Sequence, residues 1–315
     1  MKIVLAAFLF GLLGGSAAYA GDQCLAQDDY VNDGIIQPQI PRGKQLDRFA
    51  ATLKEYGPHA TAPFHGTSLV MGDSHVAYFP AKSLAADFNA TPQDIAIFGI
   101  DGTTAEELWW MIDHLSTGFD WTDSNGMHQG FVDGIDVSHV VQVLIPNFGG
   151  NSIKRATDSS PNQIAIQEAG AVKDLYKQLG RSPRVLVTER MEGDTDGCRP
   201  YEHDKLNERV SAMAARSGSR FDYLPTPRWF TASGSDSAPH CGFDHSDGYY
   251  FILPKAVHYQ PVFYSTFLDP VISAYFAGRP QPAPGGPITA DCHPDTPPDA
   301  ASSAAAVAGD FQGPF

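Results

Sequence analysis

Short apolar runs alternate with longer amphipathic segments between residues 43 and 278. The apolar runs have strand length and cover residues 68–71, 94–100, 139–145, 184–189 and 221–226. The segments with helical periodicity cover residues 44–56, 81–88, 104–115, 162–180, 204–218 and 262–278. Strands that alternate with helices indicate a parallel sheet with helices on both faces, and uninterrupted apolar strands fit a doubly covered sheet. The pattern therefore predicts an α/β fold: a three-layer α/β/α sandwich around a mostly parallel sheet of about five strands.

The two ends of the chain differ from this middle part. Residues 1–20 contain one lysine, then an apolar run, and end in the small-residue pattern Ala-Tyr-Ala. This is typical of a secretory signal peptide. Residues 279–315 are dominated by Pro, Ala, Gly, Ser and Asp and cannot bury a core, so we expect a disordered tail. We therefore expect one domain over residues 21–278, in a protein that is secreted or periplasmic.

The charge of the chain narrows the choice of partners. The formal net charge is −15 at pH 7. Such an acidic surface disfavours nucleic acids and anionic membrane surfaces as partners. After residue 20, no apolar stretch is long enough to span a bilayer, so we expect no stable membrane insertion.

The cysteines predict disulfides without fixing their pairing. The chain has four cysteines, Cys24, Cys198, Cys241 and Cys292. An even number in an oxidising compartment favours disulfide bonds, and four cysteines allow three pairings. We favour Cys198–Cys241, which would join two loops, with Cys24–Cys292, which would join the chain ends. Four unpaired buried thiols are the alternative.

Candidate chemistry follows the predicted strands. In parallel α/β sheets, functional residues collect in the loops at the carboxyl ends of the strands. "GDSH", which contains Ser74, follows the first strand, Gly102 follows the second, and Asn147 follows the third. His258 precedes the last helical segment. The sequence therefore predicts that these four residues lie at one edge of the sheet.

The order of these blocks resembles that of the SGNH (GDSL-type) hydrolase superfamily. "VMGDSH" resembles the first block of that family and "GIDGTTAEEL" the second. "VVQVLIPN" is similar to the third block, and "HYQPVFYSTFLDP" to the segment that begins with the catalytic histidine. The resemblance extends over residues 65–277. It implies a flavodoxin-like sheet and an esterase or acyltransferase that needs no cofactor.

The resemblance also implies a role for each residue. Ser74 is the expected nucleophile and His258 the general base, because a serine hydroxyl needs a group that removes its proton near neutral pH. The Ser74 amide, the Gly102 amide and the Asn147 side chain are the expected donors to the oxyanion. Gly102 suits this role since it has no Cβ that would hinder close backbone approach. Asp73 is expected to order the turn, and it is not the acid of a triad.

The sequence departs from the family near the histidine. The family has an aspartate three residues before the catalytic histidine, and this chain has Lys255 there. Either a Ser–His dyad operates, or Asp244 or Asp247 orients the imidazole. In a rival alignment, His245 is the base. We favour His258, because a helical apolar segment follows it at the expected distance.

Two other assignments have alternatives. Asn151 follows a Gly-Gly pair and also resembles the third block, but Asn147 follows the strand directly and is favoured. Histidine, cysteine and aspartate residues crowd the loop 240–247 and could bind a metal such as Zn²⁺. We interpret this loop as a polar loop beside a disulfide, and expect no metal.

The resemblance predicts a secreted serine hydrolase that cleaves small acyl esters, such as acetyl groups, through an acyl-serine intermediate. The substrate is expected to be a small molecule or a polysaccharide ester. One alternative is an O-acyltransferase that acts on a glycan, since "GDSH" in place of "GDSL" resembles acyltransferase branches. Another is a catalytically degenerate member that binds glycan, which the lysine at position 255 motivates.

Overall fold

The computed structural model describes residues 37–146, 149, 151–152, 161–180, 182–188, 199–216, 220–224, 258, 261 and 264–278. The expected signal peptide, the expected tail and all four cysteines lie outside these residues, so the expectations about them stay predictions. Of the helices that the structure describes, none is both long enough and apolar enough to cross a bilayer.

A parallel sheet of five strands forms the middle layer, as the sequence predicts. Its strands are β1 (Ser68–Gly72), β2 (Ile95–Gly99), β5 (Gln142–Ile145), β6 (Arg184–Thr188) and β7 (Asp222–Leu224). They lie in the order β2-β1-β5-β6-β7, and every neighbouring pair is parallel. β1 therefore has β2 on one side and β5 on the other, so the loops that follow these three strands meet at one edge.

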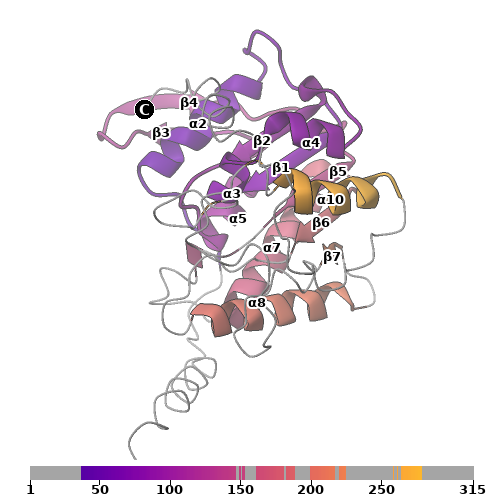
Figure 1. Ribbon diagram of the computed structural model, residues 1–315. Helices are drawn as coiled ribbons and strands as arrows, with labels where there is room; N and C mark the ends of the chain where they lie inside the picture. The colour runs from indigo at the N-terminus through magenta and orange to yellow at the C-terminus, as the bar shows by residue number, and fades with distance from the viewer. Residues whose placement is uncertain are drawn as a thin grey trace, which may run out of the picture.

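Helices cover both faces of this sheet (Figure 1). One face carries α2 (Lys44–Tyr56), α5 (Ala105–Asp113), α7 (Pro161–Leu179) and α8 (Arg199–Ala214). The other carries α3 (Ser74–Ala77), α4 (Ala81–Asp87) and α10 (Asp269–Phe276), and a π-helical turn, η3 (Tyr264–Leu268), leads into α10. A 3₁₀ turn, η1 (Pro92–Asp94), precedes β2. The three-layer α/β/α sandwich is confirmed.

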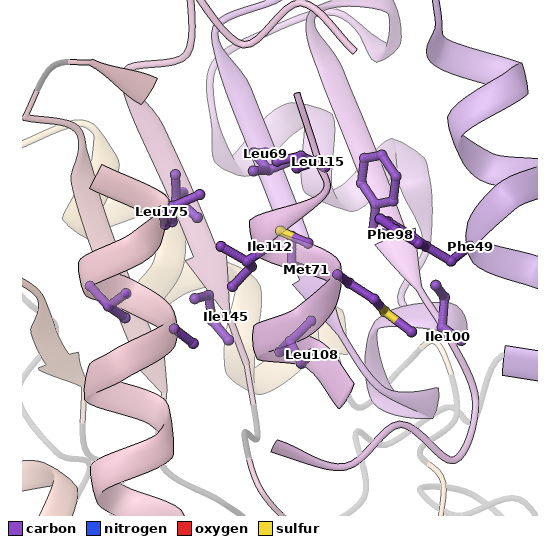
Figure 2. Packing of buried hydrophobic residues seen from close by; sticks show 14 of the residues in the cluster. Phe49, Leu69, Met71, Phe98, Ile100, Leu108, Ile112, Leu115, Ile145 and Leu175 are labelled. Atoms are coloured by element: carbon purple, nitrogen blue, oxygen red, sulfur yellow. The ribbon is translucent and has the colours of Figure 1, made fainter. Parts of the chain in front are cut away.

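The alternation of side chains along β1 explains the two cores. Leu69 and Met71 belong to the larger cluster, and Figure 2 shows Leu69 beside Leu115 and Met71 beside Ile112 of α5. Val70, which points the opposite way, belongs to the smaller cluster with residues of α3, α4 and α10. All residues of β1 are buried, because successive side chains of a strand face opposite sides and both sides are covered here.

A separate two-stranded hairpin was not predicted from the sequence. Its antiparallel strands are β3 (Phe119–Thr122) and β4 (His128–Val132). Burial alternates along β3, where Phe119 and Trp121 are buried and the residues between and after them are exposed. Apolar and polar residues alternate along β3, and β4 is mostly polar, so this segment lacks the uninterrupted apolar runs that identify the central strands.

Two buried carboxyl groups add an energetic cost to this fold. Glu168 of α7 is 1% exposed, and neither of its carboxyl oxygens has a hydrogen-bond partner among the described residues. Burial raises its pKa well above the usual range. Asp87, the last residue of α4, is also buried and forms a side-chain hydrogen bond with Asp269, the first residue of α10.

The pair formed by Asp87 and Asp269 joins two helices that pack against each other. Burial first, and then the nearby charge and hydrogen bond of Asp269, raise the pKa of Asp87 to about 9. Ionisation of both carboxyl groups in contact is unfavourable because the two negative charges repel each other. The pair therefore keeps one proton near neutral pH. The contact between α4 and α10 therefore depends on that proton.

We expect Asp87→Asn to stabilise the protein at alkaline pH and to leave its stability nearly unchanged at pH 4. The unfolded chain loses the Asp87 proton near pH 4, whereas the folded chain keeps it until about pH 9, so wild-type stability falls between these values. Asparagine donates a hydrogen bond at every pH. The expected gain at pH 8 is about 1–3 kcal/mol, measured by urea unfolding.

The matched control is Glu55→Gln, which removes one exposed carboxylate from α2. It should shift stability equally little at pH 4 and pH 8. Equal effects of Asp87→Asn at the two pH values would contradict the shared proton.

Candidate active site

The nucleophile expected from the sequence lies where β1 ends. Gly72 is the last residue of β1, Asp73 is the N-cap of α3, and Ser74 is the first residue of that helix. Ser74 is buried, with 4% of its surface exposed. α3 packs so tightly over the end of β2 that a Cβ on Gly99 would lie 2.3 Å from the Ala77 nitrogen. The glycine at that strand end therefore lets the helix that carries Ser74 sit directly on the sheet.

The carboxylate of Asp73 holds this turn together. Its Oδ1 accepts a hydrogen bond from the His75 amide at 2.9 Å, and the His75 Nδ1 lies 3.0 Å from the same oxygen. A carboxylate only accepts hydrogen bonds, so Nδ1 carries the proton in this contact when Asp73 is ionised. Asp73 is buried, and His75 is 4% exposed. The aspartate thus orders the turn beside Ser74, as the resemblance implies.

The loop after β5 reaches the same carboxylate. The Asn151 Nδ2 donates to Asp73 Oδ2 and to the Thr103 carbonyl, both at 3.1 Å. The adjacent Ser152 hydroxyl accepts the amide of Ala105, the first residue of α5, at 2.8 Å. The loops that follow β1, β2 and β5 are therefore joined by hydrogen bonds at the carboxyl edge of the sheet.

Two backbone amides in this region have no partner among the described residues. They are the N–H groups of Ser74 and Gly102. Gly102 has a φ of 76°, a left-handed conformation that suits glycine. Free amides at a helix start and at a left-handed turn are suitable donors to a developing negative charge.

His258 lies beside the helix that carries Ser74. Its imidazole is half-buried, and its ring centroid is 5.8 Å from that of His75 and 4.4 Å from that of Tyr78. The chain that follows is anchored to α3, because the buried Tyr264 hydroxyl of η3 donates to the His75 carbonyl at 3.0 Å. The last helical segment thus brings a histidine from the far end of the domain to α3.

Several predicted residues lie outside the part of the chain that the structure describes. They are Asn147, Asp244, His245, Asp247 and Lys255. The choice between the two asparagines, the choice between the two histidines, and the identity of any acid that supports the base therefore stay predictions. Among the described residues, no group of three or more His, Cys, Asp or Glu side chains could hold a metal ion.

Sequence reasoning missed the contacts made by His75, Tyr78, Ser152 and Tyr264. One signal was present: His75 follows the cap residue by two positions, the spacing at which an aspartate accepts a backbone amide. The other contacts join segments that are far apart in the sequence. No local pattern reports such contacts, because they depend on how α3, α5 and η3 pack.

No family model matches the chain, and no curated protein matches its sequence. Two solved structures are similar in fold. A member of the lipolytic protein G-D-S-L family from Veillonella parvula DSM 2008 has 15% identity and a TM-score of 0.42, over 67% of this chain and 95% of that protein. A putative acylhydrolase from Bacteroides fragilis NCTC 9343 has 16% identity and a TM-score of 0.47, over 74% of this chain and 96% of that protein.

We expect Asn151→Ala to lower the free energy of unfolding by about 1–3 kcal/mol, since Asp73 and the Thr103 carbonyl both lose a donor. Asn151→Asp should lower the free energy of unfolding further at pH 7, because it would place a second carboxylate next to that of Asp73. At pH 4 one of the two carboxyl groups can take up a proton, so part of the lost stability should be regained. Urea unfolding at both pH values measures these effects.

Gln93→Glu is the control, because it adds the same charge at an exposed position of η1. It should change stability by less than about 0.5 kcal/mol at either pH. A cost of Asn151→Asp no larger than that of Gln93→Glu would show that Asn151 does not hold Asp73 in solution.

Proposed function

We propose that this protein is a serine hydrolase that cleaves small acyl esters. The observation that supports this most is the meeting of three loops at the carboxyl edge of β1, β2 and β5, with His258 beside the same short helix. Ser74, an ordered aspartate turn and two available backbone amides occur together there. These are the parts that acyl transfer through a serine needs.

In this mechanism, the Ser74 oxygen attacks the carbonyl carbon of the ester while His258 takes the serine proton. The tetrahedral intermediate collapses, His258 returns the proton to the departing alcohol, and an acyl-serine remains. A water molecule then attacks the acyl group, with His258 again as the base, and the acid is released. The Ser74 amide, at the start of α3, is one of the donors proposed for the oxyanion.

The oxyanion needs donors that are fixed before the reaction. The free amides of Ser74 and Gly102 can supply two of them, and loss of one such donor typically costs about 10²–10³ in rate. The Asn147 side chain is the third donor in our proposal. Asn151 is the alternative, but its Nδ2 already donates to Asp73 and to the Thr103 carbonyl. To serve the oxyanion, it would have to give up one of these bonds.

The substrate class rests on the resemblance of the sequence blocks and on the expected signal peptide. A secreted or periplasmic enzyme of this kind would meet acetyl or other small acyl esters on small molecules and polysaccharides. We therefore propose an acetyl ester, with a carbohydrate as one possible alcohol part. No cofactor enters the proposed reaction.

We expect a fluorophosphonate probe to label the wild-type protein and to leave Ser74→Ala unlabelled. The probe forms a covalent bond only with a serine whose proton is removed by a base. Hydrolysis of p-nitrophenyl acetate should fall by at least about 10³-fold in the same variant. Ser138→Ala, at an exposed serine, is the control and should be labelled like the wild type. A folded wild-type protein that takes up no probe would contradict the mechanism.

The identity of the base is tested by two alanine substitutions. We expect His258→Ala to lower kcat for p-nitrophenyl acetate by about 10³-fold or more, and His245→Ala to leave it within about threefold. Each variant is first compared with the wild type by thermal unfolding, so that loss of activity is not loss of the fold. The opposite ranking of the two variants would assign the base to His245.

A further inference from the structure

The imidazole of His258 lies against two aromatic side chains from one short helix. Its ring centroid is 4.4 Å from that of Tyr78, with 35° between the ring planes, and 5.8 Å from that of His75, with 62° between the planes. One ring is therefore inclined over His258, and the other meets it closer to edge-on. At the position where the resembling family has an aspartate for its histidine, this chain has Lys255.

The His75 ring is fixed by its own contacts. Its Nδ1 lies 3.0 Å from Asp73 Oδ1, its amide donates to the same oxygen, and its carbonyl accepts the Tyr264 hydroxyl at 3.0 Å. It is 4% exposed, so little room is left for rotation. The His75 ring therefore has a fixed orientation, and the His258 ring packs against it.

Tyr78 is tied to the nucleophile through the backbone. It is the C-cap residue of α3, and its amide donates to the Ser74 carbonyl at 3.0 Å. Because α3 is one turn long, the Tyr78 ring and the Ser74 side chain are carried by the same rigid unit. A histidine that packs on Tyr78 is therefore held at a fixed place relative to Ser74.

We propose that Tyr78 is the positioning residue for the catalytic histidine, and that its ring, together with that of His75, holds the His258 imidazole. This inference rests on the proposed function, in which His258 is the base. The proton that leaves Ser74 Oγ goes to the imidazole, which becomes a cation. The electron-rich face of a phenol ring attracts a cation within about 6 Å of its centroid, so the ring favours the charged form.

The step at which the His258 imidazole becomes positively charged decides whether kcat or KM depends on Tyr78. The imidazole is neutral when substrate binds and becomes cationic only as the serine attacks. An interaction that strengthens only in the transition state contributes to kcat and leaves KM nearly unchanged. Among the described side chains, His75 also contacts the His258 ring, and Asp73 and Tyr264 in turn contact His75. None of these changes when Tyr78 is replaced.

The kinetic test compares Tyr78→Leu with Tyr78→Phe on p-nitrophenyl acetate. Removal of the ring in Tyr78→Leu should lower kcat by about 10-fold or more, because small displacements of a catalytic group reduce the rate strongly. KM should stay within about twofold of the wild-type value. Tyr78→Phe keeps the ring face and should restore kcat to within about threefold of the wild type. Phe131→Leu makes the same kind of change on the exposed hairpin and is the control. Wild-type kcat in Tyr78→Leu, or an equal loss in Tyr78→Phe, would overturn the proposal.

A second measurement reports the contact without any need for activity. In ¹H–¹³C spectra, the ring protons of His258 should carry a ring-current shift from Tyr78 that persists in Tyr78→Phe and disappears in Tyr78→Leu. If the leucine variant does not fold, Tyr78→Met, whose side chain is long and unbranched, replaces it in both tests. An unchanged His258 spectrum in an active protein overturns this inference alone. A changed spectrum in a protein that neither cleaves esters nor takes up fluorophosphonate supports the ring contact and rejects the proposed hydrolase.

Discussion

An amide, an imidazole nitrogen and a side-chain amide surround the buried carboxylate of Asp73 at the end of β1. Ionised carboxylates need such donors when they leave water, and here the donors come from His75 and from Asn151. The same three contacts fix the turn that carries Ser74 and connect it to the loop after β5. The geometry of the candidate site therefore follows from the need to satisfy one buried charge.

The order of the sheet makes this convergence possible. β1 lies between β2 and β5, and its last residue, Gly72, pairs with Gly99 at the end of β2. Parallel strands place their following loops at the same edge, and the loops can reach one another because the central strand is flanked on both sides. A strand order in which β1 lay at the edge would bring only one loop to Ser74.

The layer that carries α3 also depends on the chain that comes last in the sequence. Tyr264 of η3 donates to the carbonyl of His75, and Asp269 of α10 shares a hydrogen bond with Asp87 of α4. The first contact anchors the segment after His258 to the helix that carries Ser74. The second makes the packing of α10 sensitive to protonation. The position of the histidine is thus linked to the stability of the whole helical layer.

The sequence by itself determined the alternation of strands and helices, the doubly covered sheet and the polar residues after each strand, because burial on two faces requires uninterrupted apolar runs. It did not reveal the hairpin, because its strands β3 and β4 contain polar residues among the apolar ones. It also did not reveal that Asn151 reaches Asp73, or that the rings of Tyr78 and His75 lie beside that of His258. Only the tertiary structure decided these contacts, since they join residues whose separation along the chain carries no information about their distance in space.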